Sequence, residues 1–347
     1  MFENITRAFD NIGTGRNYYF LRTSKGTHFN AFKTGNFIGI NWNYITTSDL
    51  RDLSEYEIKS KIATFEPNDS GGTGYDISTK EGKQKVTGIY NKIIRFQELR
   101  KGDMVVMPSA GSEFLAFGYI DDDEIYNELN DPQCDWNKRR TVHWITVEEI
   151  RNLDPIYYKI VYSKHAISRL NDYASHIDKV VSSVFIKEDI SHLVLDVRQN
   201  GDIKSDSLIE LMSSIKELTS ILKEELDLND LNQSTVKLNV QSPGTIEFLY
   251  RQSKSLLLAG LILTSPLIVS CSHTRGENAQ RGTPTEIADE RERNIIIINN
   301  TIQNSNLSNA EKDTLSEIAV VNYDAIANTK KSMDALGAKV ERLNTIE

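Results

Sequence analysis

The most constraining feature of the sequence is the stretch from residue 102 to residue 120, GDMVVMPSAGSEFLAFGYI, in which two apolar runs flank a polar turn. The first run covers residues 104–107 and the second covers residues 114–120. The segment between them, PSAGS, is rich in the residue types that favour turns. This pattern predicts a β-hairpin. Because no catalytic signature elsewhere in the chain is stronger, the sequence favours a binding module over an enzyme.

The segments around this hairpin predict an α+β fold. Runs rich in aromatic and β-branched side chains predict strands at residues 18–22, 37–42, 139–147 and 156–161. Capping residues and apolar spacing predict helices at residues 27–33, 48–65 and 86–99. Residues 67–83 are rich in glycine, serine and aspartate and predict a mobile loop.

Four short motifs follow one another in this region: GNFIGINW at residues 35–42, GDMVVMPS at 102–109, AFGYI at 116–120 and RRTVHW at 139–144. Together with the aromatic strand that ends at Arg22, their order resembles the PUA-like superfamily, specifically EVE-like domains and the N-terminal domains of some Mrr-type restriction proteins. The resemblance covers residues 17–165, which is less than half of the chain.

The resemblance implies a small, strongly curved β-barrel flanked by helices. Relatives with this fold, among them the YTH readers, bind nucleic acid and can hold a flipped or modified base in an aromatic pocket. An extruded base needs aromatic or apolar surfaces for stacking and polar groups for its edge. The resemblance therefore implies a nucleic-acid reader, with DNA favoured over RNA, and suits bacterial anti-phage defence.

The residue types for such a pocket are present, since all three tryptophans of the chain lie in this region. Trp42 is the leading candidate because it ends a predicted strand between two asparagines. The candidate pocket residues are Trp42, Asn41, Asn43, Ser109, Trp136 and Trp144. The candidate phosphate contacts are Arg22, Arg139 and Arg140.

Each candidate also has a structural interpretation. A tryptophan in a small barrel is often part of the core, and Ser109 is equally compatible with a plain turn. Arg139 and Arg140 could balance the acidic segment at residues 121–124. These alternatives stay open at the level of the sequence.

The second half predicts a different organisation, with residues 166–255 as an α+β domain. A helix is expected over residues 165–179, and a β-α-β-β order over residues 193–250. Within that order, turns are expected at residues 199–202 and at Ser242-Pro243-Gly244. A linker is expected over residues 272–294, leading into a C-terminal helical hairpin whose first helix begins near Pro284 or Thr285. Its second helix is expected to start with a capping box of Ser308 and Glu311 and to run to about Leu336.

The segment from Leu256 to Cys271 carries no charge and is the most apolar part of the chain. A membrane helix needs roughly 17 to 25 apolar residues, so this segment lies at the lower limit. It is compatible with a membrane-inserting helix, a helix buried between subunits, or an ordinary core helix. Residues 256–347 are accordingly expected to form an oligomerisation or membrane-associated region.

Composition excludes several classes of protein. The net charge of −9 excludes a purely electrostatic nucleic-acid binder, although residues 1–165 are nearly neutral. Two distant cysteines predict neither a disulfide framework nor a thiolate zinc site, and they fit a reducing cytosol. The N-terminus has no apolar signal core. A cytoplasmic localisation is expected, with membrane association as the alternative.

Signatures of catalysis are also missing from the sequence. The glycine-rich run at residues 71–74 lacks the Lys-Ser/Thr of a phosphate-binding loop, and histidine and cysteine are not clustered at metal spacing. Mrr-like relatives often carry Asp and Glu-x-Lys ligands for Mg²⁺, but Asp196 is not followed by a matching Glu-x-Lys. The sequence therefore predicts no catalytic residues, no metal and no cofactor.

The favoured hypothesis is a nucleic-acid sensor, residues 1–165, coupled to an oligomerising or membrane-acting C-terminal part. One alternative is a membrane-associated or structural oligomer whose N-terminal barrel binds a protein or a small nucleotide. A second alternative is a degenerate restriction-type nuclease.

Overall fold

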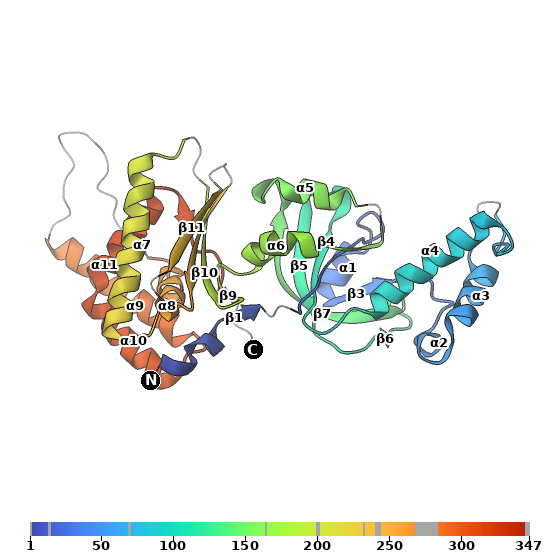
Figure 1. Ribbon diagram of the computed structural model, residues 1–347, viewed down its shortest axis with the longest axis horizontal. Coiled ribbons are helices and arrows are strands. Elements are labelled where there is room, and N and C mark those ends of the chain that lie inside the picture. Colours follow the sequence, from blue (N-terminus) through green and yellow to red (C-terminus); the bar gives the residue numbers. More distant parts are fainter. Residues whose placement is uncertain are drawn as a thin grey trace. The chain divides into compact units, whose positions relative to one another are not determined.

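The computed structural model describes residues 2–12, 15–68, 71–163, 165–198, 202–231, 233–239, 244–267 and 284–343. The chain divides into two compact units (Figure 1). The half-barrel unit is Gly15–His176, and the C-terminal unit combines Met1–Thr14 with Ile177–Glu347. The predicted boundaries therefore differ from the observed ones in three places. The first unit extends to His176 instead of ending at residue 165. The first residues belong with the C-terminal half, and residues 256–347 do not form a separate domain.

The half-barrel unit contains one curled, mixed sheet of seven strands. The strand order is β3-β7-β5-β4-β2-β8, and β6 pairs with β7. Neighbouring strands are antiparallel except β2 and β4, which are parallel. The strands are β2 (Tyr18–Leu21), β3 (Phe37–Ile40), β4 (Met104–Pro108), β5 (Phe114–Ile120), β6 (Tyr126–Asn127), β7 (Lys138–Glu149) and β8 (Ile167–Arg169). The sheet thus forms a half-barrel whose edge strands are β3 and β8.

The predicted hairpin is confirmed as β4 and β5, with Val106 opposite Phe117. Every residue of β4 is buried, which explains why this strand reads as a continuous apolar run rather than as an alternating one. At Gly118 the pairing of β5 with β7 shifts by one residue. A Cβ atom at this position would lie 2.6 Å from the carbonyl oxygen of His143, so the bulge requires glycine.

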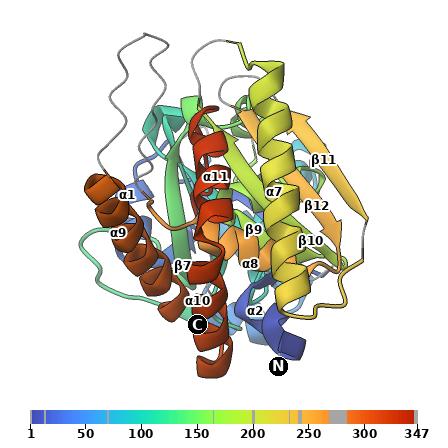
Figure 2. The ribbon, with the colours of Figure 1, turned by 90° about the vertical axis from the view of Figure 1, so that its left-hand side faces the viewer.

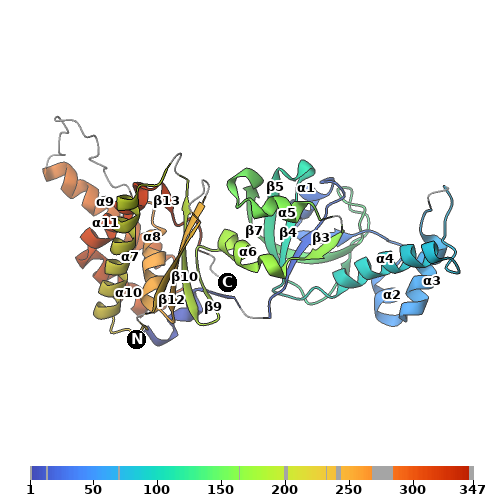
Figure 3. The same cartoon turned by 45° about the horizontal axis from the view of Figure 1, so that its top comes forward.

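The helices of this unit are α1 (Phe29–Thr34), α2 (Thr47–Asp52), α3 (Glu55–Phe65), α4 (Lys80–Gln97) and α5 (Ile156–Val161), with short 3₁₀ turns at Ala110–Ser112, Ile150–Asn152 and Asn171–Tyr173. The predicted helix over residues 48–65 is interrupted because Ser54 and Glu57 form a capping box that starts α3. Helices α2, α3 and α4 share a separate apolar cluster that includes Ile58, Ile62 and Ile93. Figure 3 shows α3 and α4 extending together away from the sheet.

Two sequence predictions near the end of this unit were wrong. Residues 156–161 form helix α5 instead of a strand, since the Asp154 side chain accepts the backbone N–H of Ile156 and starts a helical turn. Residues 165–179 are not one helix. Ile167 pairs with Leu21 in the sheet, and the helix α6 (Ala174–Val181) begins only afterwards.

The C-terminal unit contains a six-stranded sheet in the order β1-β9-β10-β12-β11, with β13 beside β10. These strands are β1 (Asp10–Ile12), β9 (Val184–Lys187), β10 (Ile190–Val197), β11 (Ser234–Asn239), β12 (Gly244–Arg251) and β13 (Ala338–Lys339). The remaining elements are a 3₁₀ turn at Phe2–Ala8 and helices α7 (Ser205–Glu225), α8 (Lys254–Leu263), α9 (Pro284–Gln303), α10 (Asn309–Val321) and α11 (Tyr323–Asp334). Figure 2 shows the helices lying over one face of this sheet.

The predicted β-α-β-β order is confirmed as β10, α7, β11 and β12. The expected turn at residues 199–202 lies largely outside the described residues, as do Ser242, Pro243 and residues 272–283 of the expected linker. The rest of that expected linker belongs to α9, which starts at Pro284. The predicted capping box at Ser308 and Glu311 is present, and α9 packs against α10. The second helix of this predicted hairpin does not run to Leu336. It ends at Val321, and a separate helix, α11, begins after Asn322.

The apolar segment that begins at Leu256 forms helix α8, which has ten residues. Every residue from Ser255 to Leu263 is buried, and the helix packs against β10, α7, α9 and α11. Its length of about 15 Å is half of the hydrocarbon thickness of a bilayer. Across the part of the chain that the structure describes, no helix is long and apolar enough to span a membrane. The core-helix interpretation therefore holds for α8, while residues 268–271 lie outside the described residues.

Candidate functional site

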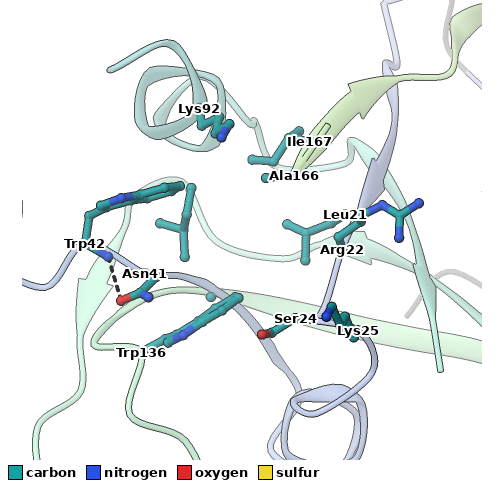
Figure 4. Close-up of a pocket in the computed structure, with 12 residues that line it drawn as sticks. Leu21, Arg22, Ser24, Lys25, Asn41, Trp42, Lys92, Trp136, Ala166 and Ile167 are labelled. Atoms are coloured by element: carbon teal, nitrogen blue, oxygen red, sulfur yellow. Dashed lines mark hydrogen bonds between the residues drawn. The ribbon is translucent and has the colours of Figure 1, made fainter. Parts of the chain in front are cut away.

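The half-barrel unit contains a cavity of about 540 Å³ at the opening of its curled sheet. Strand β3 contributes Gly39 and Ile40 from one edge of the sheet, and β8 contributes Ile167 from the other. The lining residues are Leu21, Arg22, Ser24, Lys25, Gly39, Ile40, Asn41, Trp42, Lys92, Trp136, Ala166 and Ile167 (Figure 4). The volume lies within the range of small-ligand sites.

Two tryptophans provide most of the aromatic surface of this cavity. Trp42 follows β3 directly after Asn41, and Trp136 lies two residues before β7. Figure 4 shows the two indole rings on either side of Asn41, both reaching into the cavity. Both side chains are only partly buried, so part of each indole surface is available for stacking.

The backbone at Trp42 is held in an unusual conformation. Its φ of 67° lies in the left-handed region, which costs a bulky residue about 1–3 kcal/mol. The Asn41 side chain accepts the Trp42 N–H at 2.7 Å, and the Lys138 ammonium donates to the Trp42 carbonyl at 2.7 Å. The Ile45 N–H donates to the same carbonyl. These three bonds fix the indole at the mouth of the cavity.

Lys138, which holds the Trp42 carbonyl, is a buried cation. The residue is 1% exposed, and burial lowers the pKa of its ammonium to about 8. Asp49 acts in the opposite direction and favours the charged form. Sequence reasoning missed Lys138, because a lysine at the start of an expected strand carries no signal of burial.

Arg139 supports the second tryptophan. Its guanidinium donates to the carbonyls of Trp136 and Cys134, both at 2.9 Å, and forms an ion pair with Asp131 at 2.7 Å. It also stacks over the Phe37 ring at 4.0 Å. One buried side chain therefore organises the segment that carries Trp136.

The charged groups that line the cavity all carry a positive charge: Arg22, Lys25 and Lys92. Arg22 is anchored by the carbonyls of Val161 and Ser163 at the C-terminal end of α5. Lys92, on α4, places its ammonium 5.6 Å from the centre of the Trp42 ring. Among the described residues, the lining contains no aspartate or glutamate. This arrangement favours a planar ligand that carries negative charge.

A tight turn joins this cavity to a second, smaller hollow of about 240 Å³. Ser24, Lys25 and Gly26 all have positive φ, at 51°, 59° and 95°. A Cβ atom on Gly26 would lie 2.2 Å from the backbone nitrogen of Ala110, so only glycine fits there. Arg22 and Lys25 line both hollows, and Ser109 lines the second.

The fold brings together four of the predicted site residues: Arg22, Asn41, Trp42 and Trp136. Lys25, Ser24 and Lys92 were missed. Lys92 sits on the polar side of an amphipathic helix, and only the tertiary structure places it beside Trp42.

The other predicted pocket residues lie behind or beside the cavity. Asn43 donates to the Asp135 carbonyl at 2.6 Å and accepts the Asn137 N–H at 3.1 Å, so it ties the two tryptophan-bearing segments together. Trp144 donates to the Phe32 carbonyl at 3.1 Å and packs against the core. The Ser109 hydroxyl accepts the Phe114 N–H, which is a turn contact.

The structure corrects the expectation that Arg139 and Arg140 contact phosphates. Both are buried, and Arg140 is 1% exposed. Arg140 pairs with Asp122 at 2.6 Å and donates to the Leu99 carbonyl. Their charges are thus already used inside the unit. The pairing of Arg140 with Asp122 agrees with the alternative that this arginine balances the acidic segment, whereas Arg139 pairs with Asp131 outside it.

The fold and the site define a mixed α+β protein with a half-barrel unit that carries an aromatic, positively lined cavity. A family described as Domain of unknown function (DUF8426) matches residues 19–171, which fall within the half-barrel unit. No curated protein and no solved structure matches the chain. The resemblance to the PUA-like superfamily stays a prediction.

Proposed function

We propose that the half-barrel unit binds nucleic acid and takes one base into the cavity beside Trp42 and Trp136. The observation that carries this proposal is the composition of the cavity wall, with two partly exposed indoles, an asparagine and three cations. A nucleobase offers a π-face, a hydrogen-bonding edge and a nearby phosphate. Each of these features has a partner in the cavity.

Different side chains of the cavity would contact different parts of the nucleotide. Stacking on an aromatic side chain contributes about 1–3 kcal/mol per base. The side-chain oxygen of Asn41 already accepts the Trp42 N–H, so its amide NH₂ is oriented to donate to an acceptor on the base edge. Arg22 and Lys25 line the second hollow as well, which extends the site toward a neighbouring nucleotide and toward Ser109.

The charge of the chain limits how much affinity can come from phosphates. With a net charge of −9, attraction to nucleic acid rests on the local cations. If the three lining cations each contact one phosphate, the slope of log affinity against log salt is about −2 to −3. A slope near −10 would indicate an extended electrostatic interface instead.

The proposal is tested by equilibrium binding of the full-length chain to fluorescein-labelled single-stranded, double-stranded, modified and unmodified oligonucleotides at fixed salt. Trp42→Ala is expected to weaken binding by about 5- to 150-fold, which corresponds to one lost stacking contact. Trp144→Phe is the matched control, because Trp144 is outside the cavity lining. Equal affinity of the wild type and Trp42→Ala would reject the proposal.

A free nucleotide presents the same planar ring and phosphate as an oligonucleotide. Competition with mononucleotides separates the two ligands. Displacement at concentrations near those of the oligonucleotide would favour a small-nucleotide sensor. Absence of displacement would favour a nucleic-acid reader.

The C-terminal unit supplies the second part of the proposal, which is self-association. Helix α9 exposes Ile287 and Ile296, and α10 exposes Val320 and Val321, the last with 75% of its surface free. Exposed apolar surface favours contact with another chain where it forms a contiguous patch. Light scattering after size exclusion should give a multiple of the 39.3 kDa chain mass, and Val321→Glu with Ile296→Glu should lower it. Ile209→Glu, an exposed site on α7, serves as the control.

A further inference from the structure

Three metal-ligating side chains from distant parts of the sequence meet beside the cavity. One ligand atom each from His28, Cys134 and Asp135 lies within 4.8 Å of the others. We propose that these residues bind a divalent transition metal of the zinc type. The site is independent of the proposed base pocket, since none of the three residues lines that cavity.

The donor set matches this class of metal. Thiolate, imidazole and carboxylate are the ligands that Zn²⁺ prefers, at about 2.3, 2.0 and 2.0–2.2 Å. The His28 Nε2 and the Asp135 Oδ1 are 3.8 Å apart, close to the separation of two ligands around one tetrahedral ion. The Asp135 side chain is exposed, so it can complete the approach without disturbing the core. A water molecule would take the fourth position.

Burial favours two of the ligands. His28 is 9% exposed and Cys134 is 3% exposed, so neither has to be withdrawn from solvent. When the metal binds, the Cys134 S–H proton leaves to solvent as the sulfur–metal bond forms.

The charges of the site balance. A thiolate and a carboxylate together neutralise a dication. The nearest buried cation, Arg139, is already paired with Asp131 and donates to the Cys134 carbonyl. A bound dication therefore does not leave an uncompensated charge beside that arginine.

The position of the site suggests its effect. His28 precedes α1, whereas Cys134 and Asp135 precede Trp136, so a metal would fasten two separate segments. The His28 ring packs on the Trp136 ring, with centroids 4.3 Å apart. Ligation would thus fix the indole that forms one wall of the cavity.

The test uses the full-length chain after removal of metal with a chelator, titrated with Co²⁺ and then with Zn²⁺. Co²⁺ is expected to give a thiolate-to-cobalt charge-transfer band and intense tetrahedral d–d bands at one ion per chain, which Zn²⁺ then abolishes. Cys134→Ser should remove the charge-transfer band. Cys271→Ser, the other cysteine of the chain, should retain it.

A second variant, Asp135→Asn, removes a proposed ligand without unfolding the protein, because this exposed residue can be changed without opening the core. It is expected to weaken Co²⁺ binding at least tenfold while circular dichroism stays unchanged. A wild-type chain without the charge-transfer band, or a band that survives in Cys134→Ser, would overturn the proposal.

Discussion

Lys138 and Arg139 are neighbours in β7, and each holds a different wall of the cavity. Lys138 donates to the carbonyl of Trp42, and Arg139 donates to the carbonyl of Trp136. Alternation along a strand sends adjacent side chains to opposite faces. Two consecutive buried cations can therefore reach two segments that lie far apart in sequence.

Lys138 makes the stability of the half-barrel unit depend on pH. Burial lowers its pKa in the folded protein to about 8, whereas the unfolded chain has the ordinary value of 10.5. Between pH 8 and 10 the unfolded state binds more protons, so this group raises the free energy of unfolding as pH increases. The rise approaches about 1.4 kcal/mol per pH unit at most.

The substitution Lys138→Met removes this pH-dependent contribution to the free energy of unfolding. Both proteins are unfolded with a chemical denaturant across pH 7–10. The free energy of unfolding of the wild type should rise relative to that of Lys138→Met as the pH increases. Burial also raises the pKa of Tyr44, an effect that acts above pH 10 and is common to both proteins. Parallel pH profiles would contradict the assignment.

Individual residues also show which parts of the site could be predicted from the sequence and which could not. Trp42 was predicted because a tryptophan that ends a strand between polar residues is a recognisable local pattern. Lys92 and Lys138 depend on pairings between β3, β7 and α4 that no local pattern contains. Arg139 and Arg140 were assigned to phosphates because a sequence does not reveal that an arginine is buried opposite Asp131 or Asp122.

Among the elements, those with complete local signals were predicted well. The hairpin of β4 and β5 has two apolar runs and a turn, and α10 has its capping box. Helix α5 was mistaken for a strand because IYYKIV is rich in β-favouring residues, while its start depends on Asp154 just before it. A local capping contact outweighed strand propensity there.

Two helical glycines give a matched pair of predictions. Gly88 lies within α4, and no neighbouring atom lies within 4 Å of the position that an added Cβ atom would occupy. Gly88→Ala should therefore stabilise the protein by about 0.5–1 kcal/mol. Gly260 lies within α8, where a Cβ atom would approach both methyl carbons of Val184, at 2.6 and 2.9 Å. Rotating that valine cannot relieve both contacts.

Gly260→Ala should therefore destabilise the C-terminal unit by about 1–3 kcal/mol, despite the gain in helix propensity. Thermal unfolding of the two variants beside the wild type checks both signs. A stabilised Gly260→Ala would show that α8 packs less closely against β9 than the structure indicates.

At the scale of the whole molecule, two separate segments of the chain form the C-terminal unit. Strand β1 pairs in parallel with β9, and Phe9 is buried in the core of that unit. Residues 1–14 were predicted to belong to the other unit because a three-residue strand carries almost no pattern. A fragment of residues 1–165 would leave β1 without its partner strand, so the full chain is the right material for binding experiments.

This organisation predicts that the two units respond separately to mutation. All three tryptophans lie within Gly15–His176, so their fluorescence reports the half-barrel unit, whereas circular dichroism reports both units. Phe9→Ala should cost about 3–5 kcal/mol in the C-terminal unit. The dichroism transition should move to lower denaturant while the fluorescence midpoint stays in place. A shift of the fluorescence midpoint by the same amount would contradict independent unfolding.

The most direct test of the central claim is tryptophan emission from the full-length Trp144→Phe chain during titration with an oligonucleotide. In this variant both remaining indoles, Trp42 and Trp136, line the cavity. If a base stacks on them, the emission should be quenched in proportion to the bound fraction measured by anisotropy. Binding that leaves the emission unchanged would place the nucleic acid outside the cavity and contradict the account.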